Sequence, residues 1–554
     1  MKNSYIYNYS LLILFVLFSL IINVQGAQAA AEKKPYTVVS NEVYGDQLGT
    51  VKFPASCTKE AKRHLDRGLA LLHNMTYEDS RNEFEKATIL DSECAMGYWG
   101  QAMTFIHPLW SDPPSEEDFK KGQDLLKTAK AQSEKTEWEK AYIKAAEAYY
   151  AAGMNEKEKE NLVSFQRTWK EVYLQFPGDV EAASLFAVSH LATVDPADKS
   201  FAKQKRAGAI AEKVLLELPD HPGAHHYIIH AYDSPELADR ALTAARSYGN
   251  LAPDVPHALH MPTHIFTRLG YWDESIAMND RSADAALKHP INGQISLHHP
   301  HALDYMVYAY LQIGEDQKAL EVWSTLEALK GPYQPHVASA YTFAAVPARI
   351  ALEQQKWEIA SALEPRIPES YPWERFPAME AITYYAKALG AAKSGDSQSA
   401  KQAIKTLMEL EKQTAETSKY WGKQVEIQRI SAMAWLKYYE GENEKALDLM
   451  RQAAKLESST AKHPVTPGEI LPSRELLADM LLDLGHYKEA ITEYEAALER
   501  SANRFNSLYG AARAAELGGY KDKAIHYYTK LVEMTAEDSK RERLLQAKAF
   551  LAKT

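Results

Sequence analysis

A helix-pair pattern that recurs along the chain constrains the fold more than any other feature of the sequence. Its clearest copy occupies residues 474–502, RELLADMLLDLGHYKEAITEYEAALERSA. Small and aromatic residues hold fixed places in this copy: Ala478, Gly485, Tyr487, Ala490, Tyr494 and Ala497. The small residues allow two helices to approach closely, and the aromatic side chains fill the space beside the contact. The segment therefore predicts two packed helices joined by a short turn.

The alanine of the second helix can be used to find the other copies. Ala524 follows Ala490 by 34 residues, which is the period of the tetratricopeptide repeat (TPR). Looser copies place a small residue in the same position: Ser80, Ala238, Ser275, Ala319, Ala360, Ala400 and Ala446. Their spacing from Ala238 to Ala490 is 37 to 46 residues, so the helices or connections there are longer than in the minimal unit. Residues 96–192 predict further helices without a clear register.

These observations predict an all-α fold, because strand-like alternation is nearly absent from the chain. We expect a TPR-like helical-repeat solenoid, a right-handed superhelix of about eight to ten helix pairs. It would occupy residues 57–554. Residues 30–56 lack helical periodicity and are predicted to form an extended lead-in.

Long segments resemble a group of bacterial, exported proteins that contain TPR repeats. The resemblance covers nearly the whole mature chain and is carried by FPASC, LALLHNMTYEDSRNEFEKA, DHPGAHHYIIHAYDSPELA, PHALHMPTHIFTRLG, HALDYMVYAYLQ and KHPVTPGEILPSRELLADMLL. It implies a helical-repeat fold and an exported location, but no reaction. No phosphate loop or nucleophile elbow is present in the sequence either, so the chain gives no positive sign of an enzyme.

The first residues carry the features of an export signal. Lys2 is followed by the apolar run LLILFVLFSLII at 11–22 and by the A-x-A site Ala27-Gln28-Ala29. We therefore predict a signal peptide at 1–29 and a periplasmic or secreted protein without a membrane span after cleavage. The alternative is an uncleaved N-terminal membrane anchor. The net charge of −11 and the absence of a basic stripe argue against a nucleic-acid partner.

The chain has two cysteines, Cys57 and Cys94, each of which precedes a predicted helix. An even count in an exported protein favours a disulfide, and their separation of 37 residues is about one repeat. Stacked repeats place equivalent helix starts side by side, so this pairing is geometrically reasonable. The alternative is two free, buried thiols.

Eleven of the nineteen histidines lie between His221 and Tyr310. In a TPR fold, which the repeats resemble, the first helix of each pair lines a concave groove. Counting back from the anchors places these candidate ligand-binding residues on that surface: His230, His260, His264, Arg268, His301, Asp304 and Tyr308. Arg268 would supply a fixed positive charge suited to a carboxylate. The leading hypothesis is an exported scaffold that binds a protein or peptide in this groove and needs no cofactor.

The alternative is a metal-binding protein or a metal-dependent enzyme that uses the His/Asp cluster at 226–304. His226 with His230, and His260 with His264, are i,i+4 pairs on one helix face. Each pair could hold Zn²⁺ or Cu²⁺, with His301 or Asp304 completing the shell. A third possibility is a polar core without a ligand. The loop KHPVTPG at 462–468 either caps the groove or simply connects two helices.

Overall fold

The computed structural model describes residues 44–110, 112–132, 135–154, 158–196 and 198–554. These described residues belong to one compact unit. The predicted signal peptide at 1–29 and the first part of the predicted lead-in lie outside them. Residues 44–57 contain no helix, and the first described helix begins at Lys59.

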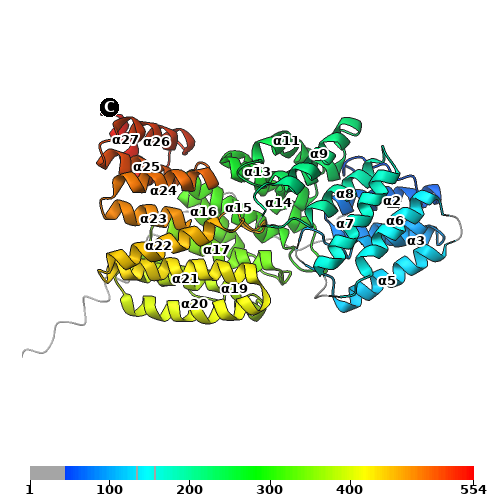
Figure 1. Cartoon of the computed structure of the whole chain (residues 1–554), viewed down its shortest axis with the longest axis horizontal. Coiled ribbons are helices and arrows are strands. Elements are labelled where there is room, and N and C mark those ends of the chain that lie inside the picture. Colours follow the sequence, from blue (N-terminus) through cyan, green and yellow to red (C-terminus); the bar gives the residue numbers. More distant parts are fainter. Residues whose placement is uncertain (1–43, 111, 133–134, 155–157, 197) are drawn as a thin grey trace, which may run out of the picture. The chain divides into compact units, whose positions relative to one another are not determined.

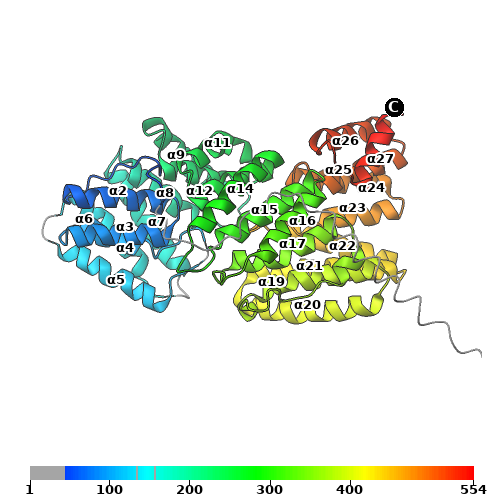
Figure 2. The ribbon, with the colours of Figure 1, turned by 180° about the vertical axis from the view of Figure 1, so that it is seen from behind.

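Every regular element of the described chain is a helix, and strand pairing is limited to isolated bridges at Ile291–Gln294 and Ile295–Tyr333. Successive helices pack against each other in pairs and follow one another in chain order (Figures 1 and 2). The N-terminal pairs are α2 (Lys59–His73) with α3 (Tyr77–Leu90), α4 (Ala95–Met103) with α5 (Glu116–Ala131), α6 (Glu137–Tyr150) with α7 (Glu158–Gln175), α8 (Val180–Leu191) with α9 (Ala202–Glu217), and α10 (Pro222–Tyr232) with α11 (Leu242–Leu251).

The next pair has a broken first helix, and short 3-10 helices η3 (Ala238–Ala241) and η4 (Trp373–Arg375) lie in two connections. The remaining pairs are α12 (Pro256–His260) and α13 (Pro262–Leu269) with α14 (Trp272–Lys288), α15 (His298–Gln312) with α16 (Asp316–Ala328), α17 (Val337–Glu353) with α18 (Trp357–Ser361), α19 (Pro377–Lys393) with α20 (Ser397–Thr417), α21 (Lys419–Tyr439) with α22 (Asn443–Ser458), α23 (Ser473–Asp483) with α24 (Tyr487–Arg500), and α25 (Phe505–Leu517) with α26 (Lys521–Met534). Helix α27 (Glu542–Leu551) packs on the last pair.

The predicted fold class, a TPR-like helical-repeat solenoid, is confirmed. The anchor residues of the pattern are all completely buried: Ser80, Ala238, Ser275, Ala319, Ala360, Ala400, Ala446, Ala490 and Ala524. Aromatic side chains fill the space that small residues leave. A Cβ atom added to Gly510 of α25 would lie 2.2 Å from the Tyr494 ring of α24, so the two helices need glycine there.

The described residues form twelve helix pairs, more than the eight to ten expected. The three pairs without an anchor residue are α4–α5, α6–α7 and α8–α9, which overlap residues 96–192, where the sequence showed no register. The reason is visible in the second helices of that region. The fourth position, which holds Ala490 in α24, holds Phe119 in α5 and Asn161 in α7. Both side chains are buried, so the pairing is kept although the small residue is missing.

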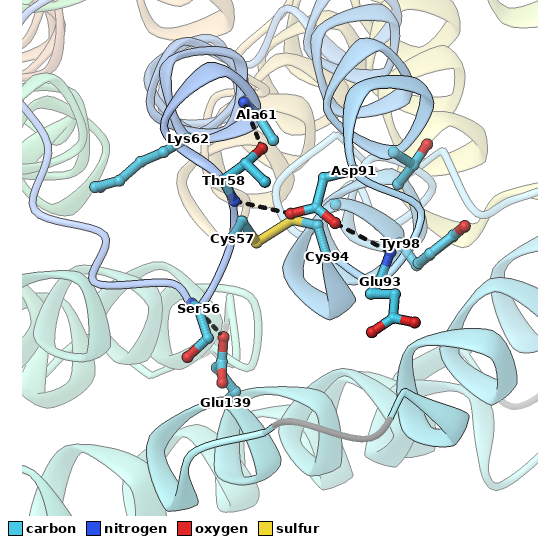
Figure 3. Close-up of a disulfide and its surroundings, with 12 residues drawn as sticks. Ser56, Cys57, Thr58, Ala61, Lys62, Asp91, Glu93, Cys94, Tyr98 and Glu139 are labelled. Atoms are coloured by element: carbon cyan, nitrogen blue, oxygen red, sulfur yellow. Dashed lines mark hydrogen bonds between the residues drawn. A yellow bond between two sulfur atoms is a disulfide. The ribbon is translucent and has the colours of Figure 1, made fainter.

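The predicted disulfide between Cys57 and Cys94 is confirmed (Figure 3). It joins the segment before α2 to the N-terminus of α4, which are equivalent starts of successive helix pairs. Thr58 N–H beside the disulfide donates to Asp91 Oδ2 at 2.8 Å, and Ser56 N–H donates to Glu139 Oε1 at 2.7 Å. The bridge closes a loop of 37 residues and would stabilise the fold by about 4 kcal/mol in the chain-entropy account.

None of the described helices combines the length and the apolar character that a bilayer crossing requires.

Candidate metal centre

Helices α10, α12, α13 and α15 bring six imidazole rings together inside the fold. The rings form two groups of three, and within each group the candidate ligand nitrogens lie within 4.8 Å of one another. Triad A consists of His226, His230 and His257, and triad B consists of His260, His264 and His301. All six are buried except His230, which is half-buried. Helix geometry explains the pairs, because residues four positions apart lie above one another.

Pro262 breaks the helix between the first two members of triad B. Proline has no N–H to continue the helical ladder, so α12 ends at His260 and α13 begins at Pro262. The backbone nevertheless stays close to helical, since Met261 keeps α dihedral angles. The Nε2 atoms of His260 and His264 therefore still approach to 3.1 Å across the break. His301 arrives from α15, with its ring centroid 4.3 Å from that of His260.

Hydrogen bonds determine which nitrogen carries the proton in triad B. Nδ1 of His264 donates to Asp233 Oδ2 at 3.0 Å, because a carboxylate oxygen can only accept. Nδ1 of His260 donates to Asn279 Oδ1 at 2.8 Å, and the amide of Asn279 is oriented by its own donation to the Ser275 carbonyl at 2.9 Å. In the neutral rings each Nε2 atom then carries a lone pair instead of a hydrogen. The two Nε2 atoms face each other at 3.1 Å. A cation between the two nitrogens would stabilise such a pair.

Triad A has a similar but looser arrangement. Nδ1 of His226 donates to the carbonyl of His73 at 2.7 Å, so Nε2 of His226 is also a lone pair. It faces Nε2 of His230 at 3.1 Å. Neither ring nitrogen of His257 has a hydrogen-bond partner, although the side chain is only 7% exposed. Nδ1 of His301 in triad B is likewise buried without a partner.

Burial keeps these rings neutral at physiological pH. Removal from water lowers the pKa of His226 to about 3 and lowers the pKa of His264 despite the opposing effect of Asp233. Two causes hold the pKa of four further rings well below 6.5: burial is the larger, and repulsion from neighbouring imidazoles is the smaller. These rings are His230, His257, His260 and His301. A proton is therefore a poor candidate for the cation between the facing nitrogens. Neutral imidazole is the form that binds Zn²⁺ and Cu²⁺.

The triads line a cavity of about 70 Å³, which is large enough for several water molecules. Its wall contains seven imidazoles: His230, His257, His264, His298, His301, His336 and His463. Three residues of the loop at 462–468, His463, Pro464 and Val465, form part of its wall. Tyr305, whose ring lies against His260 and His264, donates its hydroxyl hydrogen to the loop carbonyls of Pro464 and Thr466, both at 3.0 Å.

A larger, open groove of about 830 Å³ adjoins the cavity. Leu109, His230 and Pro464 line both spaces, so the half-buried ring of His230 lies at their boundary. Lys462 and Asp233 line the groove beside it. Burial lowers the pKa of Lys462 to about 7, although Asp233 at 3.9 Å opposes the change. The boundary thus offers a path by which a small ligand could reach the triads.

The structure brings together five of the six residues that the sequence proposed as metal ligands: His226, His230, His260, His264 and His301. The sixth, Asp304, belongs to neither triad. Its Oδ1 instead accepts a hydrogen bond from Arg349 Nη1 at 2.9 Å, and both side chains are fully buried. Counting back from the anchor residues gave the wrong surroundings for Asp304. This residue lies on the part of α15 that meets α17, whereas His301 and Tyr305 lie on the part that meets α12.

Two further predicted ligand-binding residues are engaged elsewhere. Nε of Arg268 bonds Asp233 Oδ1 at 2.7 Å, so its charge is balanced within the protein and is not free for a ligand carboxylate. The hydroxyl of Tyr308 accepts a hydrogen bond from Arg504 at 3.0 Å in a different buried network. Of the residues proposed for the groove surface, His230, His264 and His301 line the cavity.

Sequence reasoning missed several residues that complete the centre. His257, three residues before His260 on α12, was not proposed as a ligand. Asp233 ends α10 three residues after His230, and Asn279 lies on the second helix of the next pair. Both orient triad B through Nδ1, a role for which the chain offers no spacing signal.

A third group of candidate ligands, His73, Glu181 and His221, lies next to triad A. Nε2 of His73 and Nε2 of His221 both approach Glu181 Oε2, at 2.8 Å and 3.2 Å. Nδ1 of His221 accepts from Ala224 N–H at 2.9 Å, and Nδ1 of His73 lies 2.9 Å from the Tyr227 hydroxyl. Each ring can therefore donate through Nε2 and accept through Nδ1, which satisfies the group without an ion.

No protein-family model and no curated protein matches the chain. Among solved structures, the human IFIT1 dimer with m7Gppp-AAAA is 14% identical and matches over 89% of this chain and 99% of that chain, with a TM-score of 0.35. Yeast Tom70 is 13% identical and matches over 89% of this chain and 95% of that chain, with a TM-score of 0.28. These values carry no information on ligands. Fold and site define this protein as an all-α helical-repeat protein with a buried, histidine-lined cavity.

Proposed function

We propose that this protein binds a transition-metal ion, Zn²⁺ or Cu²⁺, in triad B, and that the helical repeats are the scaffold for that site. The observation that carries the proposal is the pair of facing Nε2 lone pairs of His260 and His264, 3.1 Å apart in a site where protonation is unfavourable. An ion bound to both nitrogens turns this repulsion into attraction.

The dimensions of triad B fit such an ion. Two nitrogens about 2.05 Å from a tetrahedral ion lie roughly 3.3 Å apart, close to the observed separation. The acceptors on Nδ1 of His264 and His260, Asp233 and Asn279, are the partners that metal-binding imidazoles usually have. A set of imidazoles without a carboxylate suits Zn²⁺ and Cu²⁺ better than Mg²⁺ or Ca²⁺. His301, whose candidate nitrogen lies within 4.8 Å of those of His260 and His264, would supply the third ligand.

The test is the metal content of untagged protein after equilibration with Zn²⁺ and removal of free ion. We expect at least one tightly bound equivalent in the unaltered protein and at least one equivalent less in H264Q. His225 provides the matched control, because it is a buried histidine of α10 that belongs to neither triad. H225Q should keep the metal content unchanged. Unaltered protein without bound metal, or equal loss in both variants, would overturn the proposal.

The open groove supports a second candidate function, the capture of a protein or peptide segment. Its volume of about 830 Å³ and its mixed lining, with Leu162 and Val163 near Lys462, suit an extended peptide. Substitution of Val163, which is exposed and lines the groove, by aspartate would test this role by reducing peptide capture without changing the bound metal. Equal capture by V163D and the unaltered protein would contradict it.

Export also remains a proposal, supported by the order of charge, apolar run and A-x-A site at the N-terminus. The intact mass of protein recovered from the periplasm tests it. A mass that begins near Ala30 is expected, and a mass that retains residues 1–29 would contradict cleavage.

A further inference from the structure

Triad A is a second cluster of three imidazoles in the same part of the fold, and nothing in the proposed function uses it. Nδ1 of His226 is committed to the His73 carbonyl, so Nε2 of His226 is a lone pair directed at His230. His230 could donate a hydrogen bond to it, and that would satisfy this pair of rings. His257 would still lack a partner, because this buried side chain has no hydrogen bond at either ring nitrogen. It lines the same cavity.

The two triads open into one space. His230 and His257 of triad A and His264 and His301 of triad B all line the cavity. The ring centroids of His230 and His264, one from each triad, are 6.5 Å apart. Ions held by the two triads would therefore be neighbours rather than independent sites.

We propose that triad A binds a second metal ion, so that the cavity holds a dinuclear centre with three imidazoles on each ion. This inference rests on the proposed function of triad B. It adds His257 as a ligand and makes His230, at the boundary with the groove, the ligand nearest to entering molecules.

Charge balance indicates what else the centre takes. Two divalent ions would introduce four positive charges into a buried site where Asp233 is the nearby carboxylate, already shared with Arg268 and Lys462. A small oxygen-donor anion bound between the ions would reduce this charge. Two other histidines that line the cavity, His336 and His463, suit such a ligand. Nδ1 of His336 and Nδ1 of His463 accept backbone N–H groups at 3.1 Å, which leaves each neutral ring an Nε2–H donor.

Metal stoichiometry of the full chain tests the dinuclear centre. Cu²⁺-loaded unaltered protein should contain two equivalents, while H257Q and H301Q should each contain one. H299Q is the matched control, since His299 is a buried residue of α15 outside both triads, and it should keep two. One equivalent in the unaltered protein that is lost only in H301Q would overturn the dinuclear proposal and leave the proposed function intact. No bound metal would overturn both.

Electron paramagnetic resonance distinguishes neighbouring ions from separate ones. In the unaltered protein we expect a signal well below that of the total copper, because two adjacent Cu²⁺ ions bridged by an anion couple magnetically. H257Q should return the signal to the full value for its single ion. Azide, as an anionic probe, should add a charge-transfer band to the loaded unaltered protein and bind at least tenfold more weakly to H257Q. A full-strength signal from two equivalents, or equal azide binding, would contradict a shared centre.

Discussion

Two sets of buried ligand groups lie close together in this fold and differ in one respect. In the group of His73, Glu181 and His221, the carboxylate accepts from both rings and also from the backbone N–H of Lys52 at 2.7 Å. In triad B, lone pairs face each other and no hydrogen remains to join them. Proximity alone would identify both as metal sites. The balance of donors and acceptors separates a closed structural network from the centre that we propose to hold a cation.

The two sets meet at His73, whose carbonyl accepts from His226 while its ring belongs to the closed group. The closed group therefore positions triad A. This contact predicts that the closed group matters for stability and the triads matter for binding, and the following experiments test that separation.

Removing Glu181 should give the largest effect. Burial alone would raise the pKa of this carboxyl, but His221 and His73 hold it well below its usual range. Glu181→Ala leaves two buried imidazole donors and the backbone N–H of Lys52 without an acceptor, so we expect a loss of about 3–5 kcal/mol in the free energy of unfolding. Denaturant unfolding of the metal-free protein measures it. H264Q serves as the contrast and should lose much less, since it removes a repulsion. Similar losses in both variants would remove the distinction.

Metal binding should stabilise the protein by a smaller amount. An ion at 100 times its dissociation constant stabilises the folded state by about 2.7 kcal/mol. The unfolding midpoint of the unaltered protein should therefore rise with added Zn²⁺, and that of H260Q should rise by clearly less, because triad A is unchanged in that variant. An equal rise in H260Q would place the ion elsewhere.

The acid response of the metal-free protein should give the smallest effect. Burial lowers the pKa of His298 to about 3, so below pH 6.5 the unfolded chain binds a proton that the folded chain does not. Stability contributed by the neutral ring is present above pH 6.5 and is lost as the pH falls toward 3. Glu181 behaves differently, because its depressed pKa contributes stability above pH 4.5 that is lost only at lower pH.

Each imidazole that stays neutral in the fold adds about 1.4 kcal/mol per pH unit to this loss. H298Q should therefore reduce the slope of unfolding free energy by about that amount between pH 5.5 and 4.5. A slope identical to that of the unaltered protein would show that His298 is protonated in the fold.

The sequence predicted the fold well because each helix pair requires a recognisable local residue pattern. A small residue at the contact, such as Ala490 or Ala524, is required by packing within one repeat. The pattern is absent at Phe119 and Asn161, where larger side chains occupy the fourth helix position and the neighbouring helices accommodate them.

The sequence could predict only those contacts of the site that follow from residue spacing within one helix. The pairs His226–His230 and His260–His264 are visible because four residues make about one turn. The partner of Asp304 is 45 residues away, and the contact of His73 with Glu181 spans 108 residues. Tertiary packing alone decides such contacts, which is why Asp304 was assigned to the histidines and the closed group was not found.

X-ray absorption at the Zn edge of the loaded, untagged protein tests the central claim most directly. We predict a first shell of nitrogen at about 2.0–2.1 Å with the outer-shell scattering of imidazole, changed in H264Q and unchanged in H225Q. A shell that lacks imidazole scattering, or a spectrum of H264Q identical to that of the unaltered protein, would contradict metal binding by triad B.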